Sequence, residues 1–277
     1  MLRIWLVGLI SLASSASGAA AAGYDDFAQG LSALNRGADA EAIAFFTSAL
    51  AAGDLNPNLV PIAYLDRGRA HIEREEYALA IPDLTAALKA KPDSRPAYIS
   101  RAYASTFVGN ADGAVADYTK AIALSPDADG YVGRGRARWI TGDFAGAGAD
   151  FAQSVKMFPK ATYWVLWQGM SQMRAGAFDA AGFSDAVSSL DFDGWPRPLF
   201  DFYRGRITPE ALMKTASDGD ARTVSEHRCE ANFYIAQWWI ARQNIEAAKP
   251  LLEDARTSCP ANYDIHFLSD VELKRLK

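Results

Sequence analysis

AYLDRGRAHIEREEYALAIPDLTAALKAKPD, residues 63–93, decides the fold of this chain, because the chain repeats the pattern twice more. Residues 97–127 read AYISRAYASTFVGNADGAVADYTKAIALSPD, and residues 130–160 read GYVGRGRARWITGDFAGAGADFAQSVKMFPK. The offsets between the three stretches are 34 and 33 residues. A period of this length, with two short helical patterns in each unit, predicts a helical repeat whose units cannot bury their apolar faces alone. The sequence therefore predicts an all-α solenoid with a long concave surface for binding other macromolecules.

Four positions in each unit carry the same kinds of residue. If the closing proline is numbered 32, position 8 is Gly or Ala, position 20 is Ala, and position 24 is large. These residues are Gly68, Ala80, Leu84 and Pro92, then Ala102, Ala114, Tyr118 and Pro126, then Gly135, Ala147, Phe151 and Pro159. Small residues let the two helices of a hairpin approach, the large residue fills the space between them, and proline ends the second helix. This pattern resembles the tetratricopeptide repeat.

The same frame extends in both directions and divides the chain into segments. We interpret residues 1–22 as a signal peptide, 23–194 as five tetratricopeptide repeats, 195–228 as an atypical helix pair, 229–262 as a C-terminal repeat and 263–277 as a capping helix. The fifth repeat is degenerate, because Asp185 stands at position 24. The expected fold is a tetratricopeptide-type solenoid of about six helix hairpins. A capping helix with a polar, solvent-exposed outer face ends the stack.

Two polar motifs predict helix starts in the second half of the chain. Thr208-Pro209-Glu210 has the order of an N-cap, a first-turn proline and an early acid. Thr223 and Glu226 have capping-box spacing, which predicts that the next helix begins several residues before the repeat frame requires.

The first residues have the pattern of a targeting segment. Arg3 is followed by a mostly apolar stretch at 4–13 and by small residues at 14–22, which predicts a cleaved secretory signal. The apolar stretch is too short for a stable membrane span. The first cysteine is Cys229, so we expect no lipid anchor. The expected location is the periplasm.

The composition and the cysteines agree with an exported binding protein. The formal net charge is −5, which argues against nonspecific binding to nucleic acid or anionic membranes. Cys229 and Cys259 stand at positions 1 and 31 of one unit. These positions are neighbours at the same end of an antiparallel helix hairpin. In an oxidising compartment this placement predicts a disulfide.

Residue patterns for chemistry are weak. The three histidines, His71, His227 and His266, have no metal-ligand spacing. Ser225-Glu226-His227 is consecutive, so its side chains diverge on a helix and cannot form a triad. The glycine-rich stretch at 142–150 is the turn inside a repeat rather than a phosphate loop. We therefore expect no catalytic residues, no metal and no cofactor.

Arginine at position 7 occurs together with aspartate at position 23. The expected pairs are Arg67 with Asp83, Arg101 with Asp117, and Arg134 with Asp150. Both residue types are missing together from the other recognisable units. We interpret the pairs as structural ion pairs across each hairpin, with a role in the groove as the alternative.

The inner face of a tetratricopeptide stack uses fixed positions of the first helix in each unit. Here positions 6, 9 and 13 give Asp66, Arg69, Glu73, Ser100, Tyr103, Phe107, Gly133, Arg136, Ile140, Trp167, Met170 and Arg174. Arginine and aromatic residues are common anchors of protein interfaces. We predict that this set lines a partner-binding groove for proteins or peptides. The Lys and Asn residues that grip chaperone C-terminal tails are missing.

A closer resemblance comes from three stretches in the second half. They read YWVLWQGMSQMRAGAF at 163–178, GWPRPLFDFYRGRITPEALM at 194–213 and EHRCEANFYIAQWWIARQNIEAAKPLLEDA at 226–255. Their order and spacing resemble the bacterial envelope lipoprotein family called NlpI. That resemblance implies an all-helical periplasmic homodimer that brings peptidoglycan hydrolases to a carboxy-terminal processing, or tail-specific, protease. The missing anchor cysteine is a departure from the family.

The expected function is thus a periplasmic adaptor or scaffold with no active site of its own. The alternative is an assembly factor for a secretion or outer-membrane complex that uses the same repeat scaffold. A third interpretation, an enzyme with an unrecognised site, has no motif to support it.

Overall fold

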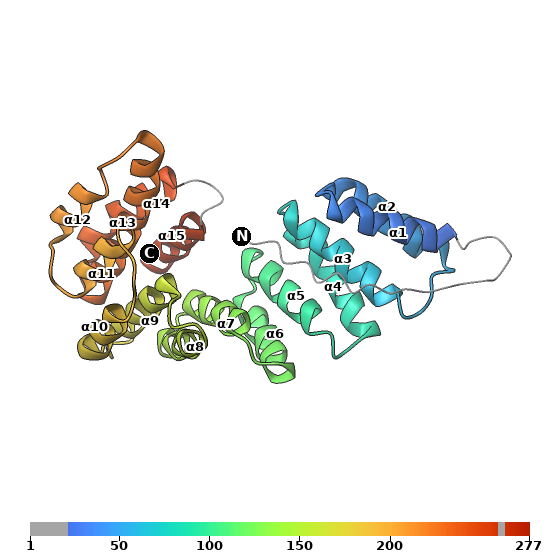
Figure 1. Ribbon diagram of the computed structural model, residues 1–277, viewed down its shortest axis with the longest axis horizontal. Helices are drawn as coiled ribbons and strands as arrows, with labels where there is room; N and C mark the ends of the chain where they lie inside the picture. Colours follow the sequence, from blue (N-terminus) through green and yellow to red (C-terminus); the bar gives the residue numbers. More distant parts are fainter. Residues whose placement is uncertain (1–21, 260–263) are drawn as a thin grey trace.

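The protein is described by a computed structural model that covers residues 22–259 and 264–277. Within those ranges the chain forms fifteen α-helices and no strand, which confirms the all-α prediction (Figure 1). The first ten helices are α1 (Ala22–Asn35), α2 (Asp39–Ala52), α3 (Val60–Glu73), α4 (Tyr77–Ala90), α5 (Arg95–Phe107), α6 (Ala111–Leu124), α7 (Ala128–Thr141), α8 (Phe144–Met157), α9 (Thr162–Arg174) and α10 (Ala180–Ser188). The others are α11 (Arg197–Tyr203), α12 (Pro209–Thr215), α13 (Ala221–Ala241), α14 (Ile245–Ser258) and α15 (Asp264–Arg275). The expected signal peptide lies outside the described residues, except for Ala22.

The first ten helices form five hairpins that stack side by side. The hairpins close where a small residue faces a large one, as the repeat pattern predicts for the first four. In the fifth, Phe183 faces Gly169, two positions before the Asp185 that the frame places there. At Gly68 an added Cβ would lie 2.8 Å from Cγ of Leu84, and at Gly30 it would lie 2.7 Å from Cε1 of Phe46. Leu84 and Phe46 are fully buried. The close helix approach therefore depends on glycine at these positions.

The helix starts follow local sequence signals. Asn110, Asp127, Asp143 and Asp179 each accept a hydrogen bond from the backbone N–H three residues later, where glycine stands each time. Thr208 caps α12 in the same way, through the N–H of Ala211. These side chains satisfy backbone donors that the helix leaves free.

The long helix α13 corrects one prediction. Asp220, rather than Thr223, is its N-cap and accepts a hydrogen bond of 2.8 Å from the Thr223 N–H. The helix therefore begins at Ala221, eight residues before the start of the C-terminal repeat predicted at 229. Thr223 lies inside the first turn, where it donates its backbone N–H to the true cap.

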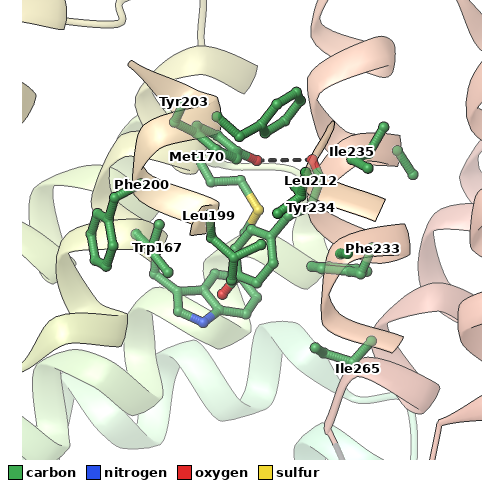
Figure 2. Close-up of a cluster of buried hydrophobic side chains, with 14 of the residues drawn as sticks. Trp167, Met170, Leu199, Phe200, Tyr203, Leu212, Phe233, Tyr234, Ile235 and Ile265 are labelled. Atoms are coloured by element: carbon green, nitrogen blue, oxygen red, sulfur yellow. Dashed lines mark hydrogen bonds between the residues drawn. The ribbon is translucent and has the colours of Figure 1, made fainter. Parts of the chain in front are cut away.

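The segment 194–213 fills the core of the C-terminal half. Its two short helices, α11 and α12, contribute Leu199, Phe200, Tyr203 and Leu212, all at most 4% exposed. Figure 2 shows these side chains in one buried cluster with Phe233 and Tyr234 of α13. The Tyr203 hydroxyl donates to the Tyr234 carbonyl at 3.0 Å. The aromatic residues of this segment are therefore explained by packing.

The last helix does more than cover the end of the stack. The C-terminal half curls so that α15 lies beside the first helices of the middle repeats (Figure 1). The Phe267 ring is 5.1 Å from the Phe107 ring of α5. Arg275 donates to the carbonyls of Trp139 and Ile140 in α7, at 3.0 and 2.9 Å. Helix α15 thus packs on α14 and also on the inner face of the solenoid.

Candidate protein-binding groove

The open part of the inner face lies on α3 and α5. Arg69 and Glu73 project from α3; the Arg69 side chain is 37% exposed, and Glu73 is exposed. Tyr103 and Phe107 are partly buried on α5, with ring centroids 4.9 Å apart. Phe107 also stacks on Tyr77 at 4.6 Å. Charged side chains beside an ordered aromatic group form a surface suited to a peptide or protein.

Two predicted groove residues are buried beneath this surface. Asp66 is 8% exposed and Ser100 is 7% exposed. Burial raises the pKa of the Asp66 carboxyl to about 6, and the Arg69 guanidinium, 3.8 Å away, partly opposes that rise. The charged form of Asp66 therefore lowers the stability of the folded protein at neutral pH. Burial also raises the pKa of the Tyr103 hydroxyl on α5, to about 12.

Three predicted groove residues contact the chain's own C-terminal helix. Arg136 pairs with Asp264, and the Ile140 carbonyl accepts from Arg275. Arg174 pairs with Glu272 at 2.9 Å, and the two side chains are 6% and 0% exposed. Burial lowers the pKa of Arg174, and the Glu272 carboxylate opposes that effect. Helix α15 occupies the inner face here, which the sequence pattern did not predict.

Three more predicted groove residues serve packing. Trp167 is 7% exposed and Met170 is fully buried, because α11 and α13 fold over α9. Gly133 faces the Tyr118 ring, and an added Cβ would lie 2.3 Å from Cε1 of that ring. Sequence position alone could not distinguish these residues from surface ones. The distinction depends on the curl of the C-terminal half.

Each predicted arginine lies against its aspartate, and each also reaches the preceding repeat. Nε and Nη2 of the arginine donate to the two carboxylate oxygens, at 2.6 to 2.9 Å in all three pairs. Nη1 donates to a threonine hydroxyl of the unit before it. The sets are Thr47–Arg67–Asp83, Thr85–Arg101–Asp117 and Thr119–Arg134–Asp150. A tyrosine ring three residues before each arginine lies 5.6 to 5.9 Å from the guanidinium carbon.

We call these sets the arginine ladder. The sequence prediction included the aspartates but missed the threonines and tyrosines. The signal was available, because Thr47, Thr85 and Thr119 all stand at position 25 of their units. The ladder ends where Ala152 replaces the threonine and Gln168 replaces the arginine. The arginine–aspartate contacts lie within one hairpin, and the arginine–threonine contacts join neighbouring hairpins. Both are expected of residues with a structural role.

The predicted disulfide joins Cys229 and Cys259. Cys229 lies two turns into α13 rather than at its start, and Cys259 follows the end of α14. Both cysteines are buried. The bond therefore fastens the two helices of the last hairpin.

Two cavities flank the contact between α15 and the inner face. One, of about 230 Å³, is mostly apolar and lies among α5, α7 and α15, where Tyr103, Phe107 and Phe267 line it. The other, of about 240 Å³, lies among α7, α9, α13 and α15, where Trp164, Trp167 and Glu230 line it. Arg136 and Asp264 border both cavities. The ion pair is thus the partition between them.

The histidines and acids do not assemble into a metal centre in the described part of the chain. No group of three His, Cys, Asp or Glu side chains there is arranged to hold an ion. His71 lies 2.8 Å from Glu76, and the His227 ring stacks on Trp195 at 4.2 Å. Within the same residues, no helix combines the length and apolarity needed to cross a membrane.

A family comparison matches the regular part of the stack. The family described as tetratricopeptide repeat matches residues 65–129, 107–161 and 132–191. These overlapping matches cover residues 65–191, which hold the three arginine–aspartate pairs of the ladder and most of the degenerate fifth unit. The sequence matches therefore agree with the repeat frame.

Solved structures resemble this chain over 62% to 91% of its length. A tetratricopeptide repeat protein from Parabacteroides merdae has a TM-score of 0.62 at 16% identity, over 91% of this chain and 99% of that protein. PilW, described as a widely conserved type IV pilus biogenesis factor, has a TM-score of 0.51 at 16% identity, over 90% and 99%. The MamA protein has a TM-score of 0.55 at 19% identity, over 62% and 98%. At these identities the likeness shows the fold alone.

Two curated proteins match shorter stretches. The SGT1 homolog of Bos taurus is 44% identical over 59 residues, which is 21% of this chain. Serine/threonine-protein phosphatase T of Aspergillus oryzae is 35% identical over 86 residues, which is 31% of this chain. The matched residues span only 17% of the length of each relative.

Proposed function

Because this chain is a tetratricopeptide repeat protein, we propose that it binds a protein or peptide on the open inner face of α3 and α5. The observation that carries this proposal is the aromatic group of Tyr77, Tyr103 and Phe107 beside the charged Arg69 and Glu73. Helix α15 covers the inner face of α7 and α9 and touches α5 at Phe107, so α3 and the rest of α5 offer the accessible part. Aromatic and arginine side chains supply much of the free energy at protein interfaces.

For the biological role, we propose a periplasmic adaptor that brings peptidoglycan hydrolases to a carboxy-terminal processing protease. Two observations support it: the export signal expected at residues 1–22, and the resemblance of segments 163–178, 194–213 and 226–255 to the envelope adaptor family. The same resemblance supports a homodimer. The mechanism is proximity. A scaffold that holds protease and substrate together raises their effective concentration into the millimolar range.

The first experiment tests binding by the inner face. Mature protein is cross-linked in the periplasm, and captured proteins are identified by mass spectrometry. Replacing the exposed Glu73 with lysine should reduce capture at least tenfold while the melting temperature stays near that of the parent. Replacing Arg69 with glutamate should also reduce capture, and it should lower the melting temperature because it brings a second acid to the buried Asp66. Lys89→Glu, at an exposed position of the second helix of the same hairpin, is the control. Equal capture by all variants would contradict an inner-face site.

The second experiment separates the two biological roles. Purified protein is mixed with the processing protease and a hydrolase, and cleavage is followed with time. The adaptor role predicts faster cleavage and a longer hydrolase half-life in a deletion strain. Capture of secretion or outer-membrane components, with unchanged hydrolase half-lives, would instead support an assembly factor. Size measurement in solution tests the homodimer.

A further inference from the structure

The second cavity contains a buried carboxylate with an unusual set of neighbours. Glu230 of α13 is 7% exposed and lines the cavity of about 240 Å³. Its Oε2 accepts hydrogen bonds from the Tyr163 hydroxyl at 2.9 Å and from Trp195 Nε1 at 2.8 Å. Both donors are neutral, so they orient the carboxylate without cancelling its charge.

Among the described residues, no lysine, arginine or histidine forms an ion pair with Glu230. Arg136 borders the same cavity, but its partner is Asp264, so the charges of these two side chains offset each other. Burial raises the pKa of Glu230, and the two hydrogen bonds oppose that rise. A buried acid normally has a cation beside it, because an unpaired buried charge is costly. The cavity therefore has the electrostatic character of a cation site.

The walls of the cavity suit the same kind of ligand. Tyr163, Trp164 and Trp167 come from α9, and Tyr234 comes from α13. Aromatic faces attract an ammonium group and pack against an alkyl chain. Beside the cavity the surface is apolar, because Phe158 is 58% exposed and its ring lies 5.9 Å from the Trp164 ring. The cavity therefore combines aromatic rings with one buried carboxylate in its lining.

From this arrangement we propose that the cavity beside Glu230 binds a primary alkylammonium group, as carried by a lysine side chain of a peptide partner. The ammonium would pair with Glu230, and the alkyl stem would lie between the aromatic rings. An acidic ligand would be repelled by the same carboxylate. This pocket is lined by α9 and α13 and is separate from the inner face of α3 and α5. An experiment can therefore contradict binding at one site and leave the other proposal unaffected.

The test uses two probes that differ only in charge. Nα-acetyl-lysine methylamide carries the ammonium, and Nα-acetyl-norleucine methylamide has a similar stem without it. The reporter is the NMR signal of the Trp195 indole N–H, which donates to Glu230. Its signal is assigned by Trp195→Phe. The lysine probe should shift this signal saturably, and the norleucine probe should bind at least tenfold more weakly.

A matched pair of variants tests the carboxylate. Glu230→Gln keeps the shape and a hydrogen-bond acceptor but removes the charge, and should weaken binding of the lysine probe at least tenfold. Glu210→Gln, at an exposed position of α12, should bind as the parent does. Equal binding of the two probes to the parent would overturn the proposal. Unchanged binding by a folded Glu230→Gln, or no response of the Trp195 signal, would also overturn it.

Discussion

Arg101 shows how one side chain stabilises two neighbouring repeats. It forms a bidentate pair with Asp117 inside its own hairpin and donates to Thr85 of the preceding one at 3.1 Å. The arginine and aspartate side chains are 24% and 11% exposed. A pair this protected should contribute more than a surface salt bridge.

We predict that Arg101→Ala lowers the free energy of unfolding by about 2 kcal/mol, because Asp117 keeps its charge and loses its partner. Asp117→Ala should have a similar effect, and the double variant should lose less than the sum. Denaturant unfolding of the four proteins completes the cycle. Additive losses would mean that the two side chains act independently.

Gly133 tests whether an inner-face position is needed for packing. We predict that Gly133→Ala costs about 1 to 3 kcal/mol, because the new methyl group would push the buried Tyr118 ring. Gly148→Ala is the control inside a neighbouring helix, since the nearest atom to its added Cβ is 3.5 Å away. That variant should gain about 0.5 to 1 kcal/mol from helix propensity. Both variants are measured by thermal melting. If both raise or both lower the melting temperature, the predicted clash with the Tyr118 ring is wrong.

Asp66 gives a pH-dependent prediction. Its pKa in the folded protein, about 6, lies above its ordinary value of 3.8, mainly because of burial. The protonated form is therefore favoured by folding. The stability it contributes is fully present below about pH 4 and is lost as the pH rises through about 6.

Accordingly, Asp66→Asn should match the parent at pH 4 and exceed its stability at pH 7.5, by at most about 3 kcal/mol. Urea unfolding at several pH values measures the difference. If the difference in unfolding free energy between the two proteins does not grow between pH 4 and 7.5, the charged form of Asp66 does not destabilise the fold.

At the scale of elements, the disulfide is the covalent link of the last hairpin. It closes a loop with a sequence separation of 30 residues between α13 and α14. We predict that replacing Cys229 and Cys259 with alanine lowers stability by roughly 3 kcal/mol, because the unfolded chain gains freedom. Calorimetry compares the two proteins. Reactive thiols in unreduced periplasmic protein would show that the bond does not form there.

Sequence patterns predicted the elements well where the signal was local. The repeated small, large and proline positions predicted the hairpins, and Thr208 predicted the start of α12. They failed at Asp220, because the capping-box pair Thr223 and Glu226 offered a competing start for α13. Both signals are plausible in isolation. The aspartate is the cap because its side chain reaches the Thr223 N–H at the helix end.

At the scale of the whole molecule, the curl was not predictable from the repeat pattern. The pair α11 and α12 has lost that pattern, so no periodic rule sets the direction of the chain after it. The consequence falls on the candidate site: Arg136 and Arg174 meet Asp264 and Glu272, which stand 128 and 98 residues away. Local periodicity carries no information about contacts of that separation.

Because the arginine ladder repeats the same contacts in each unit, a whole repeat can be removed from the N-terminal half without changing those contacts. Residues 63–96 form one complete 34-residue period, so removing them would place Ala97 where Ala63 stood and bring Arg101 opposite Thr47. The contacts described above for α15 are made with residues of α5, α7, α9 and α14 that lie outside the deleted stretch, so these contacts would survive. We predict a folded, cooperatively melting protein that is shorter by one unit, measured by circular dichroism. Deleting 17 residues instead, which is half a repeat, should abolish folding, because the remaining helices would no longer pair in register. The length of the helix stack can therefore be changed only by whole repeats.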